Sequence, residues 1–528
     1  MLKKLINSQS SLKFYLLRFK KIYPEVYKKK IQLLKIFYVS VNSLHETSYS
    51  NRFWKILSEG YIHEIAALQN LVKYIDLSKS TKEKNFFSPN NSHKQFNHSI
   101  FNESILDNIN HLNDVYENIS LLIIKPNIEK IIRKKKFTKN LLILFIFNKF
   151  SLLLKKFFNF KLIGADSFNL RLFLILLKNK KALFFLPDEK IFPSNKFNPE
   201  LRKKLFLLGK PFLSNVEDLK LWYLICFLIP TPLIENFCSK KIENKFDSFF
   251  ISQVTMELEK KKKIAKEIEN GVKLTMYNHG GNYFSFNTSY YDHHEVQISD
   301  IYFSWADTNF LKSENSFSLK SNESIHQIPT FNIIKQRKNK KYDFVLINNA
   351  FPKLRADGTG NPCFNQAYKQ VDDVLKFLDN VVNKTENFLI KDINLPGHIN
   401  ANDYYDTRSL QKVTTTNLNL LISKSSLAVN SYYGTPFHSL MANDIPNIIF
   451  IKLSYYDFNK VFLSYLREFQ KFQLVHFNPL SASKFIENNI DNIEDIWNDP
   501  NLIKLRKDFN LKFNQNPYNW QKKISNLI

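Results

Sequence analysis

Residues 277–283 (YNHGGNY) combine a histidine with two adjacent glycines, in a chain that has only 10 glycines among its 528 residues. Two glycines at the end of a strand predict a turn that needs a positive φ angle or a close approach of the backbone to a ligand. The N–H groups of such a turn can bind an anion, and His279 can donate to a phosphate or act as an acid or base. A tight turn with a hydrogen-bonded histidine is the alternative.

Residues 293–307 (HHEVQISDIYFSWAD) carry two acids, Glu295 and Asp300. The alternation of Val296, Ile298 and Ile301 with polar residues predicts a strand with the acids near its ends. Glu295 is therefore a second candidate for a general base. The solvated edge of a strand would give the same pattern.

Residues 430–439 (NSYYGTPFHS) join an expected strand to an expected helix. The free N–H groups and the positive dipole at the start of such a helix suit a diphosphate. Thr435 is the expected N-cap, and Pro436 fits the first turn of the helix. Lys391 follows another strand on the same expected face, where its charge could neutralise a leaving diphosphate. A plain capped turn and a solvated lysine are the alternatives.

The elements that position these segments are alternating helices and short apolar strands. Apolar residues at helical spacing predict a helix over 53–72. A helix over 251–270 is expected to stop at Gly271, and residues 272–281 then form a buried strand that enters the glycine turn. From residue 342 onward, strands and helices alternate with short turns, as in a doubly wound sheet.

These patterns predict an α/β fold with two Rossmann-like domains that face a cleft, as in GT-B proteins, and with extra helices at both ends. Open α/β sheets bind ligands at the carboxyl ends of their strands, so the cleft is the expected site. The expected division is an N-terminal, acceptor-side domain at 1–310 with a helical extension and a polar insertion near 77–103, a linker at 311–341, a nucleotide-binding domain at 342–490, and closing helices at 491–528.

Composition and charge limit the classes of partner. The formal charge is +27, but most of the excess is lysine spread along the chain, as the codon supply of an AT-rich genome produces. We therefore expect no nucleic acid as a partner, and we name an anionic membrane surface as a further candidate. The three cysteines include no CxxC pair, which argues against a disulfide scaffold and a zinc finger.

Several motifs are absent. The sequence has no phosphate-binding P-loop, no HExxH, no GxSxG and no DxD, so we expect neither a metal nor a cofactor. The longest apolar stretches fall short of the ~20 residues that a membrane-spanning helix requires. The N-terminus lacks the apolar region of a signal peptide. We expect a cytoplasmic protein, peripheral on the inner face of the cytoplasmic membrane.

Four segments together resemble one family, the transferases encoded in O-antigen and other surface-polysaccharide gene clusters. Residues 42–56 (NSLHETSYSNRFWKI) look like the family's LN…H…SxRYWxI block, and the YNHGGNY turn with Glu295 and Asp300 is similar to its QHGGxYG…E…DxFxSW block. Residues 434–450 (GTPFHSLMANDIPNIIF) resemble GTTxLExLAxNIPxIxF, and residues 481–509 match the closing helical region. The order and approximate spacing hold across most of the chain.

The resemblance implies a GT-B-like glycosyltransferase with a nucleotide-activated sugar as its donor. His279 and Glu295 would be the catalytic residues. Three residues near the N-terminus would contact the acceptor or form a latch between domains, and the latch is the favoured interpretation: His45, Arg52 and Trp54. The donor-binding residues would be Gly280, Gly281, Asn282, Lys391, Asn430, Ser431, Gly434, Thr435 and Ser439.

Two positions depart from the family's pattern: Ser439 stands in place of the acid of GTTxLE, and Lys391 in place of an arginine. The predicted function is transfer of a sugar from a nucleotide-sugar donor to a glycan or lipid-linked acceptor in surface-polysaccharide biosynthesis. One open alternative is transfer of glycerol- or ribitol-phosphate from a CDP donor, because those enzymes share the GT-B outline and an HG turn. The other is a non-catalytic protein that binds polysaccharide or a membrane.

Overall fold

The computed structural model of the chain divides by its internal contacts into two units. Unit 1 comprises residues 1–142, 186–245 and 255–272, and unit 2 comprises residues 143–185, 246–254 and 273–528. The predicted polar insertion near 77–103 lies outside the described residues. The structure describes residues 10–74, 139–166, 170–186, 198–235, 237, 245–252, 258–287, 289–307, 324–327, 340–349, 351–352, 362, 365–381, 387–393, 398–399, 404–514 and 524.

Unit 1 is built from helices in the part of the chain that the structure describes. The helix predicted over 53–72 is confirmed in α3, which packs against α2, α8 and α10. Its apolar residues face this contact, and Phe53, Trp54 and Leu57 are each 0% exposed. The helices of unit 1 are α2 (Ser10–His45), α3 (Asn51–Tyr74), α7 (Pro199–Gly209), η3 (Lys210–Phe212), α8 (Val216–Leu228), α9 (Thr231–Ile234) and α10 (Leu258–Glu269).

The first sheet lies in unit 2 and has the strand order β2-β1-β3-β4-β5-β6, with every neighbouring pair parallel. Its strands β1 to β4 are almost wholly buried, as parallel strands with covered faces are. The elements are α5 (Lys139–Phe158), β1 (Lys161–Ala165), α6 (Leu170–Lys178), β2 (Lys181–Phe185), β3 (Ser248–Ile251), β4 (Lys273–Tyr277), α11 (Tyr290–Ile298), β5 (Ile301–Ser304) and β6 (Ser324–Gln327).

The second sheet, also in unit 2, has the order β11-β9-β7-β12-β13-β14 and is parallel throughout. A two-stranded antiparallel pair, β8 (Phe351–Pro352) and β10 (His398–Ile399), accompanies it. The strands are β7 (Tyr342–Ile347), β9 (Phe388–Lys391), β11 (Val413–Thr414), β12 (Ser425–Asn430), β13 (Asn447–Phe450) and β14 (Val475–His476).

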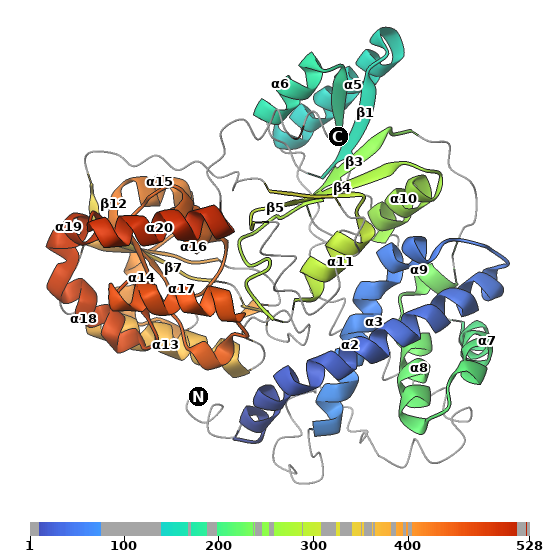
Figure 1. Ribbon diagram of the computed structural model, residues 1–528, viewed down its shortest axis with the longest axis horizontal. Coiled ribbons are helices and arrows are strands. Elements are labelled where there is room, and N and C mark those ends of the chain that lie inside the picture. Colours follow the sequence, from blue (N-terminus) through green and yellow to red (C-terminus); the bar gives the residue numbers. More distant parts are fainter. Residues whose placement is uncertain are drawn as a thin grey trace. The chain divides into compact units, whose positions relative to one another are not determined.

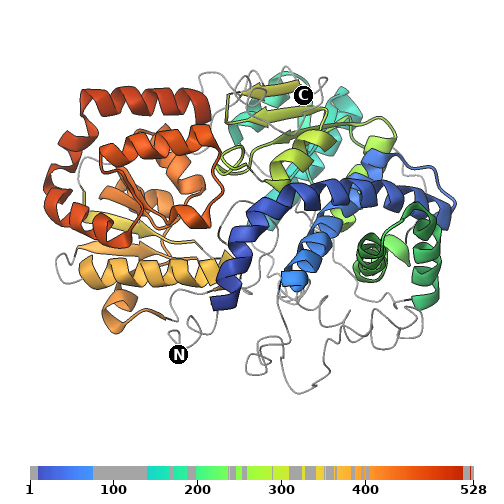
Figure 2. The ribbon, with the colours of Figure 1, turned by 60° about the horizontal axis from the view of Figure 1, so that its bottom comes forward.

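Helices cover both faces of the second sheet, and α13 and α20 lie on opposite sides of it in both ribbon views (Figures 1 and 2). This alternation confirms the predicted α/β class with two Rossmann-like sheets. The helices are α13 (Asn365–Val381), α14 (Thr407–Lys412), α15 (Leu418–Ser423), α16 (Thr435–Ala442), η5 (Leu453–Tyr455), α17 (Lys460–Lys471), α18 (Pro479–Asn489), η6 (Ile490–Asn492), α19 (Ile493–Trp497) and α20 (Pro500–Phe513).

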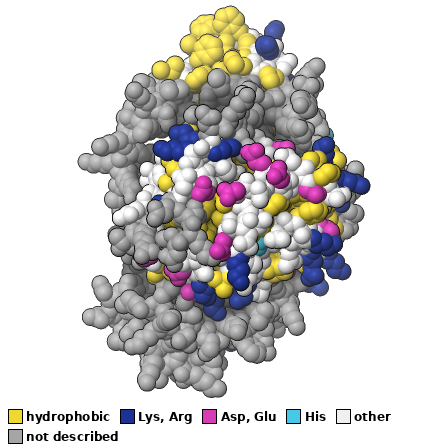
Figure 3. Space-filling model, turned by 90° about the vertical axis from the view of Figure 1, so that its left-hand side faces the viewer, with side chains coloured by type: hydrophobic (Ala, Val, Ile, Leu, Met, Phe, Trp, Pro, Cys, Tyr) yellow, Lys and Arg dark blue, Asp and Glu magenta, His cyan; other side chains and the backbone are white. Residues whose placement is uncertain are grey.

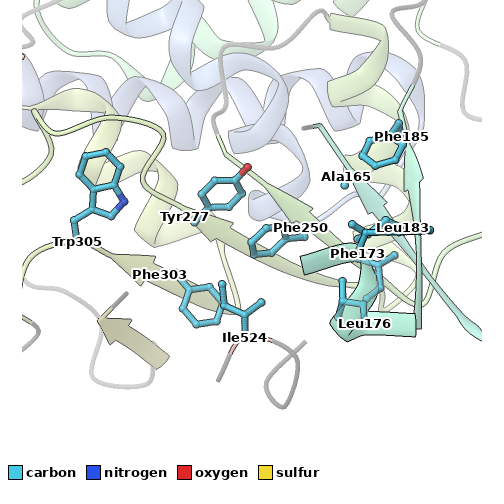
Figure 4. Close-up of a cluster of buried hydrophobic side chains, with 11 residues drawn as sticks. Ala165, Phe173, Leu176, Leu183, Phe185, Phe250, Tyr277, Phe303, Trp305 and Ile524 are labelled. Carbon is cyan, nitrogen blue, oxygen red and sulfur yellow. The ribbon is translucent and has the colours of Figure 1, made fainter. Parts of the chain in front are cut away.

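A buried cluster on the first sheet includes a residue from the far end of the chain. Ile524 is 0% exposed and packs with Phe250, Tyr277 and Phe303, which come from three neighbouring strands (Figure 4). The chain therefore returns from the second sheet to the core of the first, which ties the two sheets together within unit 2.

Two local predictions are wrong. The strand expected through Val296, Ile298 and Ile301 is not continuous, because the first two residues lie in helix α11, which ends at Ile298, and β5 begins at Ile301. The alternation arose because Val296 and Ile298 belong to the last turn of α11, whereas the next apolar residue, Ile301, begins β5. The helix expected from residue 251 begins at Leu258, since Ile251 closes β3, whereas its stop at Gly271 with φ of 92° is confirmed.

The linker expected at 311–341 holds β6, the outermost strand of the first sheet. Among the helices that the structure describes, none combines the length and the apolar character needed to cross a membrane.

Candidate functional site

The glycine turn after β4 is packed against the start of α16. The N–H of Gly281 donates to Thr435 Oγ1 at 3.2 Å, and the Tyr433 hydroxyl oxygen lies 3.2 Å from the Gly281 carbonyl oxygen. A Cβ on Gly280 would lie 2.7 Å from Thr435 Oγ1, and a Cβ on Gly281 would lie 2.4 Å from the His438 ring. Only glycine fits at either position, because both neighbours approach the backbone too closely for a side chain.

The sequence predicted a positive φ or a close approach to a ligand at these glycines, and the structure shows a different cause. Among the described glycines only Gly271 has a positive φ. The close approach at Gly280 and Gly281 is to α16 of the same chain. The positive φ of the turn falls on Phe284, at 61°.

His279 begins a chain of hydrogen bonds that runs into the protein. Its Nδ1 lies 3.0 Å from the Tyr283 hydroxyl, which donates to Glu295 Oε1 at 3.1 Å. Tyr302 donates to the other oxygen of the same carboxylate at 3.4 Å. Glu295 is 0% exposed, on α11, so it acts from inside the protein through Tyr283.

This relay assigns the tautomer of His279. Because the Tyr283 proton is directed to the Glu295 carboxylate, the Tyr283 oxygen accepts from Nδ1–H of His279, and Nε2 keeps its lone pair. The ring contacts solvent, yet partial desolvation lowers the pKa of His279, which favours the neutral form. Burial, reinforced by the charge of Glu295, raises the pKa of Tyr283 and of Tyr302 far above the ordinary value, so both stay protonated. The arrangement can take up a proton at Nε2.

Asp292 holds the turn that carries Tyr283. Its Oδ2 accepts from the Phe284 N–H at 2.6 Å, and its Oδ1 accepts from the Ser289 hydroxyl at 2.6 Å. The first bond fixes Phe284 in the left-handed region, where a bulky residue is strained. Burial raises the pKa of Asp292 to about 7, despite hydrogen bonds that favour the charged form.

The start of α16 differs from the expected cap. Its N-cap is Gly434, which is extended with φ of 179° and offers no side chain, and Thr435 is the first helical residue. The Thr435 hydroxyl instead accepts from Gly281. Gly434 is required because a Cβ there would lie 2.6 Å from the Tyr432 ring. The first turn of α16 thus has N–H groups that no cap side chain satisfies, beside the glycine turn.

A buried network joins this helix to the turn and to the end of α20. The Nδ1–H of His438 donates to the side-chain oxygen Oδ1 of Asn514 at 2.6 Å. The Nε2 of the same ring accepts from the Tyr433 hydroxyl. The proton of Tyr433 is directed to His438 Nε2, so the Ser285 hydroxyl donates to the Tyr433 oxygen. Burial lowers the pKa of His438 to about 4, so the ring is neutral. His438 therefore serves as packing and as a fixed hydrogen-bond partner behind Gly281.

Comparison with known proteins places the chain in a family. The profile of the LIC12162 family transferases matches residues 17–528. The chain belongs to this transferase family. A search among curated proteins returned no match. Within the part of this family member that the structure describes, no group of three or more His, Cys, Asp or Glu could hold a metal ion.

Solved structures also resemble this LIC12162-family transferase at low sequence identity. Acinetobacter baumannii MurG is 7% identical with a TM-score of 0.30, over 70% of this chain and 98% of that chain. The glycotransferase of kitacinnamycin is 8% identical with a TM-score of 0.32, over 70% of this chain and 97% of that chain. Spinosyn rhamnosyltransferase SpnG, complexed with thymidine diphosphate, is 8% identical with a TM-score of 0.27, over 54% of this chain and 73% of that chain.

The remaining donor-binding candidates lie around the second sheet of the LIC12162-family chain. Asn430 is 0% exposed, and its amide donates to the Ile448 carbonyl at 3.2 Å. Ser431 donates to Asn348 Oδ1 at 2.7 Å. The Lys391 ammonium, at the end of β9, donates to a loop carbonyl at 3.2 Å, and Ser439 is buried in the second turn of α16. Asn282 Oδ1 lies 3.5 Å from the Cβ position of Gly434, which places that amide beside the start of α16.

The acceptor or latch candidates lie in unit 1. Trp54 is 0% exposed, and its indole N–H donates to Asn42 Oδ1 at 2.8 Å, so it is a core residue there. His45 Nε2 lies 3.3 Å from the Leu233 carbonyl, and its ring packs on Phe237. Arg52 is half-buried at the start of α3. These contacts of His45 and Trp54 lie inside unit 1 and join α2 and α3 to the region of α9.

The sequence analysis did not identify Tyr283, which joins His279 to Glu295, or Asp292, which holds the turn. Tyr283 lies within residues 277–283, and its spacing of four residues from His279 could have indicated a contact within one turn. Asp292 and Glu295 are three residues apart, which is a shared helical face but opposite faces of a strand. The wrong strand assignment therefore concealed their relation.

Proposed function

We propose that this transferase is a glycosyltransferase that moves a sugar from a nucleotide-sugar donor to a hydroxyl of a glycan or lipid-linked acceptor. One observation carries the proposal. The neutral His279, oriented by Tyr283 and Glu295, stands on a turn that is hydrogen-bonded to the uncapped start of α16. A base and an anion-binding helix end are the two groups that sugar transfer from a diphosphate requires.

In the proposed reaction, His279 Nε2 takes the proton of the acceptor hydroxyl, and the oxygen of that hydroxyl forms a bond to the anomeric carbon of the donor. The bond from that carbon to the diphosphate breaks, and the diphosphate leaves with the electron pair. Tyr283 and the Glu295 carboxylate stabilise the imidazolium that forms, as the acid of a catalytic triad does. The N–H groups and the dipole at Gly434 and Thr435 stabilise the charge on the leaving group.

Other donor contacts are proposed from their positions. Asn282, beside Gly434, would contact the diphosphate or the sugar. Lys391 would approach the leaving group from the end of β9, where parallel-sheet proteins bind ligands. Asn430 and Ser431 would shape the floor of the same region, since their side chains are committed to internal hydrogen bonds. Ser439, buried below the first turn of α16, would support that helix.

The setting that we propose is biosynthesis of a surface polysaccharide. Its support is the resemblance of four sequence segments to transferases of O-antigen and related gene clusters, together with membership of the LIC12162 family over residues 17–528. The proposal includes transfer without a metal bridge, since the diphosphate would be held by a helix start and by lysine.

A donor panel tests the proposal. Titration calorimetry with UDP-, GDP-, dTDP- and CMP-linked sugars and with CDP-glycerol should show one nucleotide sugar that binds, and Gly434→Ala should weaken that binding because its Cβ meets the Tyr432 ring. Binding of CDP-glycerol alone would contradict the proposal and favour the phosphotransferase. Failure of every nucleotide to bind or to raise the melting temperature would favour a non-catalytic binder.

A further inference from the structure

Helix α5 of unit 2 presents an apolar stripe to solvent. Ile146, Phe150, Leu153 and Phe157 are 58%, 44%, 52% and 64% exposed. Their spacing of three or four residues places them on one side of the helix, along roughly 16 Å of its axis. Single exposed apolar residues are ordinary in proteins, whereas four in register on one helix need an occupant.

The opposite side of α5 is fixed to the first sheet, so the stripe cannot turn inward. The Asn148 side chain donates to the Phe185 carbonyl at 2.8 Å and accepts from the Phe185 N–H at 2.7 Å. Ser151 donates to the Leu183 carbonyl at 2.6 Å. The Phe147 ring packs edge-on against Phe173 of α6 at 5.0 Å. These contacts along β2 hold the exposed face of α5 outward.

Basic residues flank the stripe. From residue 146 to residue 186 the sequence has seven lysines and one arginine against a single acid, Asp166. That acid accepts from the backbone and hydroxyl of Ser252, at the far end of β1. Lys149 and Lys156 are exposed on α5 itself, and Lys161, Lys178 and Lys180 are exposed where α5 and α6 meet the amino ends of β1 and β2.

The positive charges crowd one another. Lys161 and Lys181 are register partners on β1 and β2. Desolvation, with the charge of Lys161 added to it, lowers the pKa of Lys181. Figure 3 shows hydrophobic side chains gathered at the top of that view with basic side chains beside them, at the level where Figure 1 places α5 and α6. An apolar stripe with phenylalanines, flanked by lysines, is the pattern of a helix that lies in the interface of an anionic membrane.

We propose that α5 docks on the surface of a lipid bilayer that contains anionic lipids. Phe150, Leu153 and Phe157 enter the boundary between head groups and acyl chains, and the lysines of α5 and of the amino ends of β1 and β2 contact the lipid phosphates. The docking does not depend on which reaction the site carries out. It gives the excess of lysine in this segment a specific partner.

Vesicle flotation with the full chain tests this docking. The wild type should float with vesicles of phosphatidylcholine and phosphatidylglycerol, and much less with phosphatidylcholine alone. The variant Phe150→Ser/Leu153→Ser/Phe157→Ser should bind the anionic vesicles more weakly by a factor of at least ~100. The matched control is Leu480→Ser/Leu511→Ser, which removes two exposed leucines from α18 and α20 and should float like the wild type.

A variant with fewer charges on α5 tests the membrane docking if the apolar variant does not fold. Lys149→Gln/Lys156→Gln keeps the packed side of α5 and should lower affinity for the anionic vesicles by about thirtyfold. The proposal is overturned if the wild type does not float with anionic vesicles. In that case the stripe is covered by something other than a membrane, such as a second copy, another protein or another part of the chain. The proposal is also overturned if the wild type binds neutral vesicles equally well, or if the variants bind like the wild type.

Discussion

His279, Tyr283 and Glu295 form the smallest unit from which the proposed activity follows. None of the three is sufficient alone: Glu295 has no exposure to solvent, and His279 without a partner at Nδ1 could protonate at either nitrogen. The sequence predicted His279 and Glu295 as alternative candidates for the general base. The structure makes Glu295 the partner that acts on His279 through a tyrosine.

Tyr283→Phe removes the hydroxyl that joins the histidine to the carboxylate. We expect kcat to fall by about 10- to 100-fold with little change in donor affinity, because the Nδ1 proton loses its acceptor. The matched control is Tyr302→Phe, which removes the other tyrosine from Glu295 and leaves the His279 contact in place. Steady-state kinetics of both variants check this, and equal losses in the two would contradict the relay.

Asp292 predicts a pH dependence of stability. Burial raises its pKa from 3.8 to about 7 in the folded protein, so the folded state holds this proton more tightly than the unfolded state. The stabilisation from this group is therefore complete below pH 3.8 and is lost as pH rises toward 7. Between those values the free energy of unfolding should fall by about 1.4 kcal/mol per pH unit relative to a variant without the charge.

Asp292→Asn is that variant. An asparagine can accept from the Phe284 N–H with its oxygen and donate to Ser289 with its nitrogen, so the turn keeps both hydrogen bonds. Urea unfolding of both proteins across pH 5 to 8 gives the difference in slope. Parallel curves for the wild type and the variant would show that the carboxyl is not buried in this way.

At the scale of elements, the site depends on how closely the turn after β4 approaches α16. Gly281→Ala would place a Cβ 2.4 Å from the ring of His438, which Tyr433 and Asn514 hold in place. Overpacking of this kind destabilises a protein by about 1–3 kcal/mol and should displace the turn. We expect a lower melting temperature together with a large loss of kcat.

The control for this glycine is Gly271→Ala, at the end of α10. That position has open space around a Cβ but a φ of 92°, so the substitution strains the backbone by about 1–2 kcal/mol before β4, whereas the glycine turn follows that strand. It should lower stability by a similar amount and leave kcat unchanged. If both alanine variants lose activity in proportion to their stability, the close approach at Gly281 has no specific role.

The same scale shows what could be predicted from sequence. The β7, β9, β12 and β13 strands were found because short apolar runs alternate with amphipathic helices, and this pattern is local. The α11 helix was not predicted because Ser299 and Asp300, which separate its end from the start of β5, do not visibly interrupt the spacing of the apolar residues. The contacts of Gly280 and Gly281 with α16 were out of reach, since the partners are more than 150 residues away, as the Gly281–Thr435 separation of 154 shows.

At the scale of the whole molecule, the order of the chain does not follow its units. Unit 1 gathers residues 1–142, 186–245 and 255–272, so α7, α8 and α10 leave the strands that flank them in sequence and join α2 and α3. Sequence patterns predicted α3 and α10 but not this grouping, because nothing local in a helix determines which distant helix will cover it. The return of Ile524 to the first sheet is unpredictable for the same reason.

The variant Ile524→Ala tests how much the packing of Ile524 on the first sheet stabilises the protein. The side chain is 0% exposed in the cluster of the first sheet, so its truncation should lower the free energy of unfolding by about 2–5 kcal/mol. Leu511→Ala, at a position that is 62% exposed, should change it by less than about 0.5 kcal/mol. Urea denaturation compares the two. Equal stabilities would mean that Ile524 does not pack in this core.

His279→Ala gives the most direct test of the proposed function. With the donor that the panel identifies, its transfer rate should fall by at least ~100-fold, because the variant lacks the group that we propose takes the acceptor proton. Donor affinity by calorimetry and the melting temperature should stay close to those of the wild type, since the ring is exposed and lies on a turn that Gly281 and Phe284 hold independently. Transfer at the wild-type rate by a folded His279→Ala protein would contradict the assignment of His279 as the base.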